Sequence, residues 1–280
     1  MKKILITGCN GQLGHALNER WAGRTDLELI NTDVKQLDIT KIDKVMELTE
    51  AVKPYAVINC AAHTGVDACE SQEELAYRIN AIGPRNLSIA ASRVGAKLMQ
   101  ISTDYIFSGD DHKRYVEFDA PGPKGVYGKT KLEGEHFVRE FAKDYFILRT
   151  AWLYGEGKNF VRTMLRLSEA NEKVRVVADQ FGTPTSATEL ARAIDHLLFT
   201  DNYGIFHATC EGECNWAEFT EEIFKLAGKN TKVEHITTEE YKAEAPRPAY
   251  SVLDNYMLRL TTDFMFADWH DAIAEYLKKQ

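Results

Sequence analysis

The sequence lacks any apolar run long enough to cross a membrane, and it lacks a surplus of positive charge. No stretch of the 280 residues approaches the roughly 18 consecutive apolar residues of a membrane-spanning helix. The formal net charge is −8, whereas nucleic acids and anionic membrane surfaces are bound mainly by clustered Lys and Arg. We therefore expect no membrane span, no export signal, no nucleic-acid partner and a cytoplasmic location.

The sequence also has few cysteines and no internal repeats. The five cysteines are an odd number with scattered spacings, which argues against a disulfide framework. Cys210 and Cys214 lie four residues apart, but no second pair of ligands follows them. Two ordinary thiols are therefore favoured there over the alternative of a metal site.

Apolar runs alternate with helix-like stretches through the first half of the chain. Strands are expected at 3–7, 28–32, 56–60, 97–102 and 145–148, and helices at 12–21, 42–52, 73–94 and 129–141. The helix at 73–94 is expected to be one long helix or two, interrupted near Gly83 and Pro84. Such alternation indicates βαβ units around a parallel sheet. The pattern predicts an α/β fold with a Rossmann-type doubly wound parallel sheet.

After residue 150 the pattern loosens. Helices are expected at 159–167, 189–198, 216–227 and 266–277, short strands at 174–177 and 205–208, and a partly extended loop at 231–249. We expect residues 1–150 to form a dinucleotide-binding domain, with about 186–209 folding back onto it. Residues 151–280 are then mainly a smaller α/β substrate-binding domain.

Three glycines follow the first expected strand and open the first expected helix. Gly8, Gly11 and Gly14 form a GxxGxxG sequence, and Asp33 follows Gly14 by nineteen residues, at the end of the second expected strand. Such glycines let the backbone approach a pyrophosphate at a helix N-terminus, and the acidic residue accepts hydrogen bonds from a ribose. The alternative is a tight turn with a surface aspartate. The context favours a dinucleotide site.

The same aspartate bears on the choice of cofactor. Asp33 would repel a 2′-phosphate, which favours NADH over NADPH, but Lys35 is close enough in sequence to weaken that preference. NADH or NADPH is therefore expected.

Tyr127 and Lys131 are four residues apart at the start of an expected helix. This spacing places both side chains on one face. A ketone that accepts hydride needs a proton on its oxygen, and a phenol with a pKa near 10 is a poor donor–acceptor unless a neighbouring ammonium lowers that pKa. The alternative is a common spacing on a solvated helix. Behind a dinucleotide site, the spacing predicts a catalytic pair.

Two polar residues end the expected strand 97–102. The carboxyl ends of strands in open α/β sheets face the ligand crevice. Thr103 is therefore expected to hydrogen-bond the reacting carbonyl, and Asp104 to bind substrate hydroxyls. The alternative for both is a local turn that caps the strand end.

With these motifs the chain resembles an extended short-chain dehydrogenase/reductase, and within that group the dTDP-4-dehydrorhamnose reductase family. The matching stretches run along most of the chain. They are ITGCNGQLG (6–14), VINCAAHTGVDACE (57–70), STDYIFSG (102–109), VYGKTKLEGE (126–135), LRTAWLYG (148–155), NFVRTMLRL (159–167) and DQFGTPT (179–185).

The resemblance implies reduction of the C4 ketone of dTDP-4-dehydro-β-L-rhamnose by hydride from NAD(P)H, with Tyr127 as proton donor. It implies further contacts at matching positions. The cofactor contacts are Gln12, Leu13, Asp38, Ile39, Ala62, His63 and Thr64, and the substrate contacts are Tyr105, Trp152 and Arg247. The alternative role for Trp152 is that of a plain core tryptophan, and the alternative for Arg247 is that of a surface arginine in an acidic loop.

One departure from the family concerns metal binding. Some relatives bind a divalent metal at a dimer interface through acidic residues, one of them in the first helix. Here the matching stretch, residues 14–17, has no carboxylate, although Glu189 at a partner position is acidic. We therefore expect no metal, and a monomer or weak homodimer.

Two rival functions stay open. The chain could reduce another nucleotide-linked 4-keto sugar rather than the expected dTDP-linked 4-keto-6-deoxy sugar. It could instead be a non-catalytic regulatory subunit of the same fold, an alternative that the intact set of Thr103, Tyr127 and Lys131 disfavours.

Overall fold

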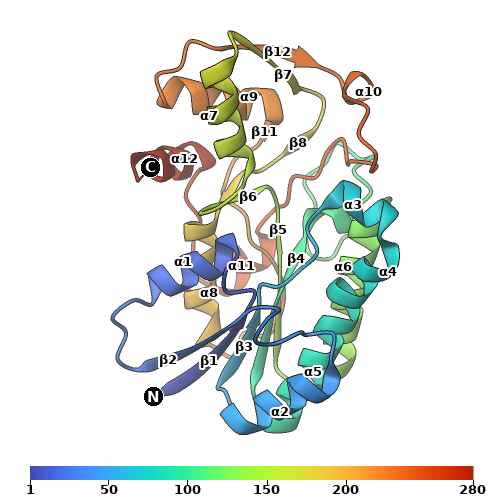
Figure 1. The fold of residues 1–280 in the computed structure, drawn as a ribbon, viewed down its shortest axis with the longest axis vertical. Coiled ribbons are helices and arrows are strands. Elements are labelled where there is room, and N and C mark those ends of the chain that lie inside the picture. The colour runs from blue at the N-terminus through green and yellow to red at the C-terminus, as the bar shows by residue number, and fades with distance from the viewer. Residues whose placement is uncertain (280) are drawn as a thin grey trace.

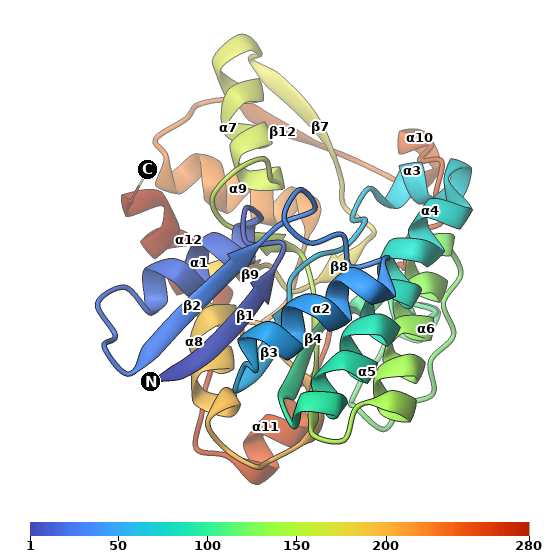
Figure 2. The same cartoon turned by 60° about the horizontal axis from the view of Figure 1, so that its bottom comes forward.

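A six-stranded parallel sheet forms the centre of the protein in the computed structural model, which describes residues 1–279 (Figures 1 and 2). Its order is β10-β5-β4-β3-β1-β2, and every neighbouring pair is parallel. The strands are β1 (Lys2–Thr7), β2 (Leu27–Thr32), β3 (Ala56–Asn59), β4 (Lys97–Thr103), β5 (Tyr145–Thr150) and β10 (Gly204–His207). The predicted doubly wound α/β fold is confirmed. The chain reverses its winding between β1 and β3, which places a ligand crevice at their carboxyl ends.

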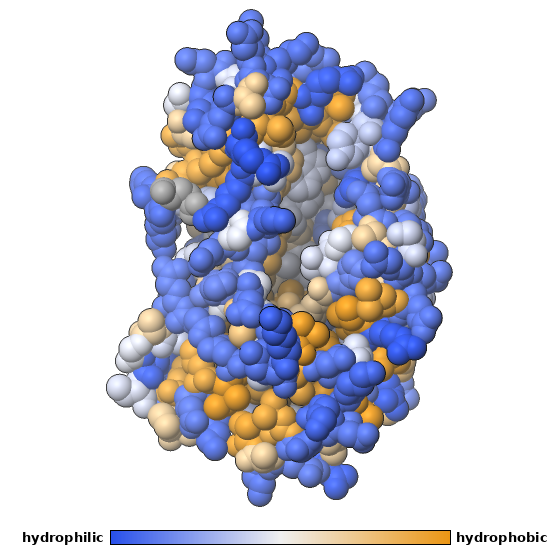
Figure 3. Space-filling model, viewed as in Figure 1, coloured by the Kyte–Doolittle hydropathy of each residue, from blue (hydrophilic) through white to orange (hydrophobic). Residues whose placement is uncertain are grey.

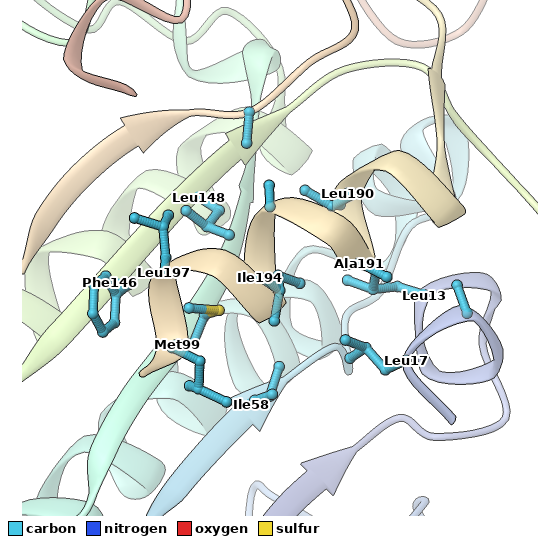
Figure 4. Close-up of a cluster of buried hydrophobic side chains, with 14 of the residues drawn as sticks. Leu13, Leu17, Ile58, Met99, Phe146, Leu148, Leu190, Ala191, Ile194 and Leu197 are labelled. Atoms are coloured by element: carbon cyan, nitrogen blue, oxygen red, sulfur yellow. The ribbon is translucent and has the colours of Figure 1, made fainter. Parts of the chain in front are cut away.

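Helices cover both faces of this sheet. One face packs against α2 (Ile42–Val52), α5 (Gly83–Val94) and α6 (Val126–Phe141), and the other against α1 (Gln12–Arg20), α8 (Ala187–Leu198) and α11 (Tyr256–Thr261). Figure 4 shows Leu190, Ile194 and Leu197 of α8 directed at the sheet, and all three are fully buried. Burial of each such side chain contributes about 1.5–3 kcal/mol. This packing holds α8 on the sheet, and β10 belongs to the sheet through its pairing with β5.

A smaller lobe lies above the sheet in Figure 1 and has its own apolar core, which includes Phe219, Ile223 and Trp269. Its helices are α7 (Phe160–Ala170), α9 (Trp216–Leu226), α10 (Thr238–Tyr241) and α12 (Trp269–Lys278). Three two-stranded sheets complete it. They pair β7 (Lys173–Val177) with β12 (Lys232–Ile236), β8 (Phe181–Gly182) with β11 (Cys214–Asn215), and β6 (Leu153–Tyr154) with β9 (Thr185–Ser186).

The structure corrects one local expectation, bears out another and adds two short helices. The expected loop at 231–249 contains β12 and α10, because β12 is stabilised by pairing with the distant β7. The helical stretch expected at 73–94 is present, and its interruption near Gly83 is a π-helical turn η1 (Arg78–Ile82) between α4 (Glu73–Tyr77) and α5. The helices α3 (Val66–Ser71) and α11 were not predicted, because six residues are too few to show a helical period. Within residues 1–279, no helix combines the length and apolarity needed to cross a membrane.

Candidate active site

A cleft of about 990 Å³ lies where the carboxyl ends of the sheet strands meet the smaller lobe. Figure 3 shows the hollow between the two parts of the molecule. All of the predicted site residues except Gly14 and His63 line this cleft. They are Gly8, Gly11, Gln12, Leu13, Asp33, Asp38, Ile39, Ala62, Thr64, Thr103, Asp104, Tyr105, Tyr127, Lys131, Trp152 and Arg247. The fold therefore brings together side chains from nearly the whole chain.

The glycine turn between β1 and α1 leaves no room for side chains. Gly8 has a φ of +66°, and a Cβ there would lie 2.7 Å from the nitrogen of Ala61. A Cβ on Gly14 would lie 2.4 Å from the carbonyl oxygen of Cys9, so Gly14 serves close helix–strand packing behind the cleft wall. Gly11 is the N-cap of α1 and offers no capping side chain. The first turn of α1 therefore presents bare backbone N–H groups to the cleft.

These features fit a dinucleotide cofactor. The Oε1 of Gln12 is buried in the wall of the cleft without a hydrogen-bond partner. Buried polar atoms are nearly always paired, so this acceptor is suited to a donor on a bound ligand. The carboxylate of Asp33 accepts hydrogen bonds from the backbone nitrogens of Asn10 (3.3 Å) and Val34 (2.7 Å), which fixes it at the end of β2. The glycine turn would hold the pyrophosphate and Asp33 the adenosine ribose.

The end of the cleft at Asp33 has an apolar lining that the sequence did not reveal. Val34 and Leu75 both line it although their side chains are 68% and 44% exposed. Exposed apolar side chains at a cleft mouth suit a flat base. Asp38 stands beside them and accepts hydrogen bonds from both the backbone nitrogen (3.0 Å) and the hydroxyl (2.7 Å) of Thr40.

The loop after β3 is held by a buried asparagine in the π-helical turn. Asn80 accepts a hydrogen bond from the backbone nitrogen of His63 (2.8 Å) and donates one to the hydroxyl of Thr130 in α6 (3.1 Å). The His63 ring lies against Gln72, with Nε2 3.3 Å from its Oε1, and not on the cleft surface. Asn80 therefore links the loop of Ala62 and Thr64 to the helix of the expected catalytic pair, a role that no local sequence pattern indicated.

Tyr127 and Lys131 lie in the first two turns of α6 and both face the cleft. Lys131 Nζ donates a hydrogen bond to the carbonyl oxygen of Ile101 (2.6 Å), and burial lowers the pKa of this lysine to about 8 against the opposing charge of Glu135. Burial raises the pKa of Tyr127, and a hydrogen bond with Thr103 only partly opposes that. The expectation of a Tyr127 pKa below its usual value is wrong for this structure, because desolvation is the largest influence on the phenol.

Asp104 is buried beside this pair and has two hydroxyl partners. Its Oδ1 accepts a hydrogen bond from Thr103 Oγ1 (2.9 Å), and its Oδ2 accepts one from Ser251 Oγ (2.6 Å). Burial raises the pKa of Asp104 to about 6. Ser251 lies 147 residues further along the chain, so only the fold reveals it as part of the site.

Arg247 reaches the cleft from the segment that follows α10. Its Nη2 donates to both carboxylate oxygens of Asp67 (3.0 and 2.9 Å), and its Nη1 donates to the hydroxyl of Tyr105 (3.2 Å). The Tyr105 ring in turn packs edge-on against Tyr127, with 5.5 Å between centroids. Arg247 is therefore a half-buried part of the cleft wall rather than a free surface arginine.

Trp152 is held in a strained conformation at the other wall. Its φ is +48°, a region that non-glycine residues rarely adopt. Its indole stacks on Trp216 with 3.5 Å between ring centroids and a 9° interplanar angle, and a Cβ on Gly182 would lie 2.5 Å from that indole. Strained backbone of this kind concentrates at functional sites. Trp216 also lines the cleft and was not predicted.

Glu189, which matches a metal-binding position of some relatives, has other partners in this structure. Glu189 accepts hydrogen bonds from Arg192 Nη1 (2.6 Å) and from the backbone nitrogen of Ala267 (2.9 Å). Between residues 1 and 279, no cluster of three or more His, Cys, Asp or Glu side chains is arranged to hold a metal ion.

Comparison with known proteins places this geometry in a family. The family model of the RmlD substrate binding domain matches residues 1–280. A curated relative, the spore coat polysaccharide biosynthesis protein SpsK of Bacillus subtilis (strain 168), is 40% identical over 100% of this chain and 98% of that protein.

Solved structures agree with that match. The crystal structure of a dTDP-4-dehydrorhamnose reductase from Clostridium acetobutylicum ATCC 824 has 52% sequence identity and a TM-score of 0.98, with 99% of each chain covered. The dTDP-4-dehydrorhamnose reductase of Bacillus anthracis str. Ames, solved in complex with NADP, has 43% identity and a TM-score of 0.98, with 100% of each chain covered.

Proposed function

Because the chain belongs to the family of the RmlD substrate binding domain, we propose that it reduces the C4 ketone of dTDP-4-dehydro-β-L-rhamnose to dTDP-L-rhamnose with NAD(P)H. One observation carries the proposal. Thr103, Tyr127 and Lys131 meet in a single cleft with the glycine turn on one side and Trp152 on the other. A proton donor therefore lies between a dinucleotide site and a wall suited to a sugar ring.

Tyr127 is the proton donor in the proposed reaction. The raised pKa keeps its phenol protonated at neutral pH, so it holds the proton that the ketone oxygen needs as the carbonyl is reduced. Thr103, whose hydroxyl donates to Asp104 in the structure, would turn this proton to the same oxygen when substrate binds and so orient it. A bound nicotinamide cofactor supplies the hydride.

Lys131 contributes position and charge. Its ammonium is fixed by the carbonyl of Ile101 and lies on the same face of α6 as Tyr127. From there it hydrogen-bonds the nicotinamide ribose and stabilises negative charge that develops on the Tyr127 oxygen when the proton leaves. The low pKa of Lys131, about 8, makes this contribution sensitive to pH.

The substrate is held by groups of three kinds. Asp104 accepts hydrogen bonds from sugar hydroxyls, Trp152 supplies an apolar wall for a 6-deoxy sugar, and Tyr105 faces the sugar beside Tyr127. Arg247 binds the diphosphate, to which a guanidinium fork is well matched. These roles are supported by the placement of all four side chains on one cleft surface.

For the cofactor we propose a weak preference for NADH, since the Asp33 carboxylate stands at the end of β2, where a 2′-phosphate would be repelled. The complex of the Bacillus anthracis relative with NADP favours the opposite choice, so both cofactors belong in the test.

A second candidate is reduction of a different nucleotide-linked 4-keto sugar. The relative SpsK, matched over the whole chain, is named for spore coat polysaccharide biosynthesis and not for rhamnose. The reaction chemistry would be the same, and only the contacts to the sugar would differ.

The deciding experiment follows cofactor oxidation with enzymatically generated dTDP-4-dehydro-β-L-rhamnose, in parallel with NADH and NADPH. We expect turnover and a product identical to dTDP-L-rhamnose. Turnover only with another 4-keto sugar would establish the second candidate. No turnover with any of these sugars would refute both.

A further inference from the structure

The helix that holds Tyr127 has no N-terminal cap of its own. An α-helix leaves its first four N–H groups without intrahelical partners. The N-cap of α6 is Gly125, which has no side chain to accept a hydrogen bond, and no acidic residue lies in the first turn. Tyr127 is the second residue of this uncapped turn.

A glutamate from a different helix supplies the missing acceptor. Glu70, near the end of α3, accepts a hydrogen bond at Oε1 from the backbone nitrogen of Val126 (2.8 Å), the first residue of α6. A Cβ on Gly125 would lie 2.8 Å from the same oxygen. The glycine therefore leaves the space through which the carboxylate reaches the helix end. A negative charge at this end also interacts favourably with the helix dipole.

The rest of the first turn is closely packed. Cys69 and Val126 belong to one buried apolar cluster, and Tyr127 packs against it. A Cβ on Gly128 would lie 2.1 Å from the carbonyl oxygen of Tyr105. The first turn of α6 therefore packs between α3 and the segment that follows β4. The hydrogen bond from Val126 to Glu70 fixes the position of this turn along α3.

We propose that Glu70 is a positioning residue for the reaction, which caps α6 from outside and thereby holds the Tyr127 hydroxyl at the reacting carbonyl. The proposal rests on the proposed role of Tyr127. Glu70 does not line the cleft, so it contacts neither the sugar nor the cofactor. Loss of the Glu70 carboxylate is expected to slow the chemical step and to leave binding of the sugar and of the cofactor unchanged.

The size of the effect follows from how sensitive proton transfer is to geometry. A displacement of about 1 Å in a reacting group can reduce the rate by about 100-fold. Loss of one cap hydrogen bond lets the first turn fray without unfolding the helix. We expect a fall of about tenfold in kcat for a variant without the cap.

The test compares Glu70→Ala and Glu70→Gln with the exposed control Glu73→Ala on the neighbouring helix. Glu70→Ala should lose about tenfold in kcat, with KM for the nucleotide sugar and Kd for the cofactor unchanged within about twofold. Glu70→Gln retains an oxygen acceptor and should keep at least about half of kcat. The deuterium isotope effect with 4-deuterated cofactor should increase in Glu70→Ala, because a misplaced Tyr127 makes the chemical step more strongly rate-limiting.

A proline substitution tests the same hydrogen bond from its other end. Val126→Pro removes the N–H that Glu70 accepts, at the first helical position, where proline is well tolerated. It should lower kcat about as much as Glu70→Ala, and the double variant should be no slower than either single variant. Val126→Pro keeps Glu70, so it remains informative if Glu70→Ala does not fold.

Three results would overturn the proposal. They are a kcat of Glu70→Ala within twofold of the parent, a rise in KM or cofactor Kd that matches the fall in kcat, and additive losses in the double variant. Tyr127→Phe measured alongside separates the two proposals. If Tyr127→Phe is inactive while Glu70→Ala is normal, only the role of Glu70 fails. If Tyr127→Phe is as active as the parent, the role of Tyr127 as proton donor fails, and the role of Glu70 fails with it. A parent enzyme that reduces none of the 4-keto sugars would instead refute the proposed function itself.

Discussion

The two halves of the cleft are built in different ways. The half that we propose binds the cofactor, the cofactor half, depends on backbone, since Gly8, Gly11 and the first turn of α1 come from one short stretch after β1. The half that we propose binds the sugar, the substrate half, depends on side chains, and it joins Thr103 from β4, Trp152 after β5 and Arg247 near the end of the chain. A local turn can be recognised within a motif, whereas an assembly of distant side chains exists only in the folded protein.

This difference predicts which properties of the protein a substitution in each half should impair. In the cofactor half an added methyl group meets backbone atoms that cannot move aside, so both stability and cofactor binding should suffer. In the substrate half, where a side chain can be shortened without a backbone clash, KM or kcat should change while the fold remains. Substitutions in each half test this contrast.

The largest effect is expected where the two halves meet. Tyr127→Phe removes the proton donor and keeps the ring that packs against Tyr105. We expect a loss of about 10²–10⁴-fold in kcat, with Kd for the cofactor unchanged, measured by steady-state kinetics and by cofactor fluorescence titration.

Tyr105→Phe is the control for that substitution, because it removes the neighbouring hydroxyl, which accepts from Arg247 (3.2 Å). It should raise KM for the nucleotide sugar more than it lowers kcat. Equal losses of kcat in the two variants would contradict the assignment of the proton to Tyr127.

The backbone half is tested by Gly8→Ala. The new Cβ would lie 2.7 Å from Ala61 N at a φ of +66°, so we expect a loss of about 2–4 kcal/mol in the free energy of unfolding and a cofactor Kd raised at least about tenfold. Gly95→Ala is the matched control, because its φ is +71° but no atom lies within 4 Å of the new Cβ. It should cost only about 1 kcal/mol and leave cofactor Kd unchanged. Similar denaturation midpoints for the two variants would contradict the steric argument.

The side-chain half is tested by Trp152→Ala. Loss of the wall beside the sugar should raise KM about tenfold, which corresponds to about 1.4 kcal/mol, and leave cofactor Kd unchanged. Trp216→Phe keeps an aromatic partner for the stack and should change KM by no more than about twofold. If cofactor binding weakens in Trp152→Ala as much as sugar binding, the division of the cleft into two halves is wrong.

The smallest expected effects concern pH. Lys131, with a pKa of about 8, is charged below that value, so kcat should fall as pH rises through about 8. Asp104, with a pKa of about 6, is charged above that value, so KM should rise as pH falls through about 6. Activity should therefore be highest between these limits. Lys131→Arg keeps its charge at high pH, so the fall in kcat above about pH 8 should disappear in this variant. In Asp104→Asn the rise in KM below about pH 6 should disappear, and the fall in kcat above about pH 8 should remain.

Local patterns were sufficient for the sheet and for most of the cofactor half. Continuous apolar runs such as Ile4–Ile6 are buried on both faces of a parallel sheet, and such runs indicate it directly. Patterns were insufficient for β12, which needs its partner β7, and for α3, whose six residues make fewer than two turns. They also gave the wrong direction for the pKa of Tyr127, because burial cannot be read from a four-residue spacing.

The substrate half shows the same limit more strongly. Trp216, Ser251 and Glu70 each reach the site, or the helix that holds Tyr127, from a separate part of the chain. Nothing in their immediate sequence distinguishes them from ordinary core or surface residues.

The doubly wound sheet, the glycine turn and the spacing of Tyr127 and Lys131 can be predicted from the amino-acid order, because each depends on residues that are neighbours along the chain. Folding establishes which side chains surround that pair, how deeply it is buried and what caps its helix, because hydrogen bonding and desolvation act over a few ångströms in space. Contacts such as Ser251 to Asp104 and Glu70 to Val126 join residues 147 and 56 positions apart, and folding alone brings them within reach.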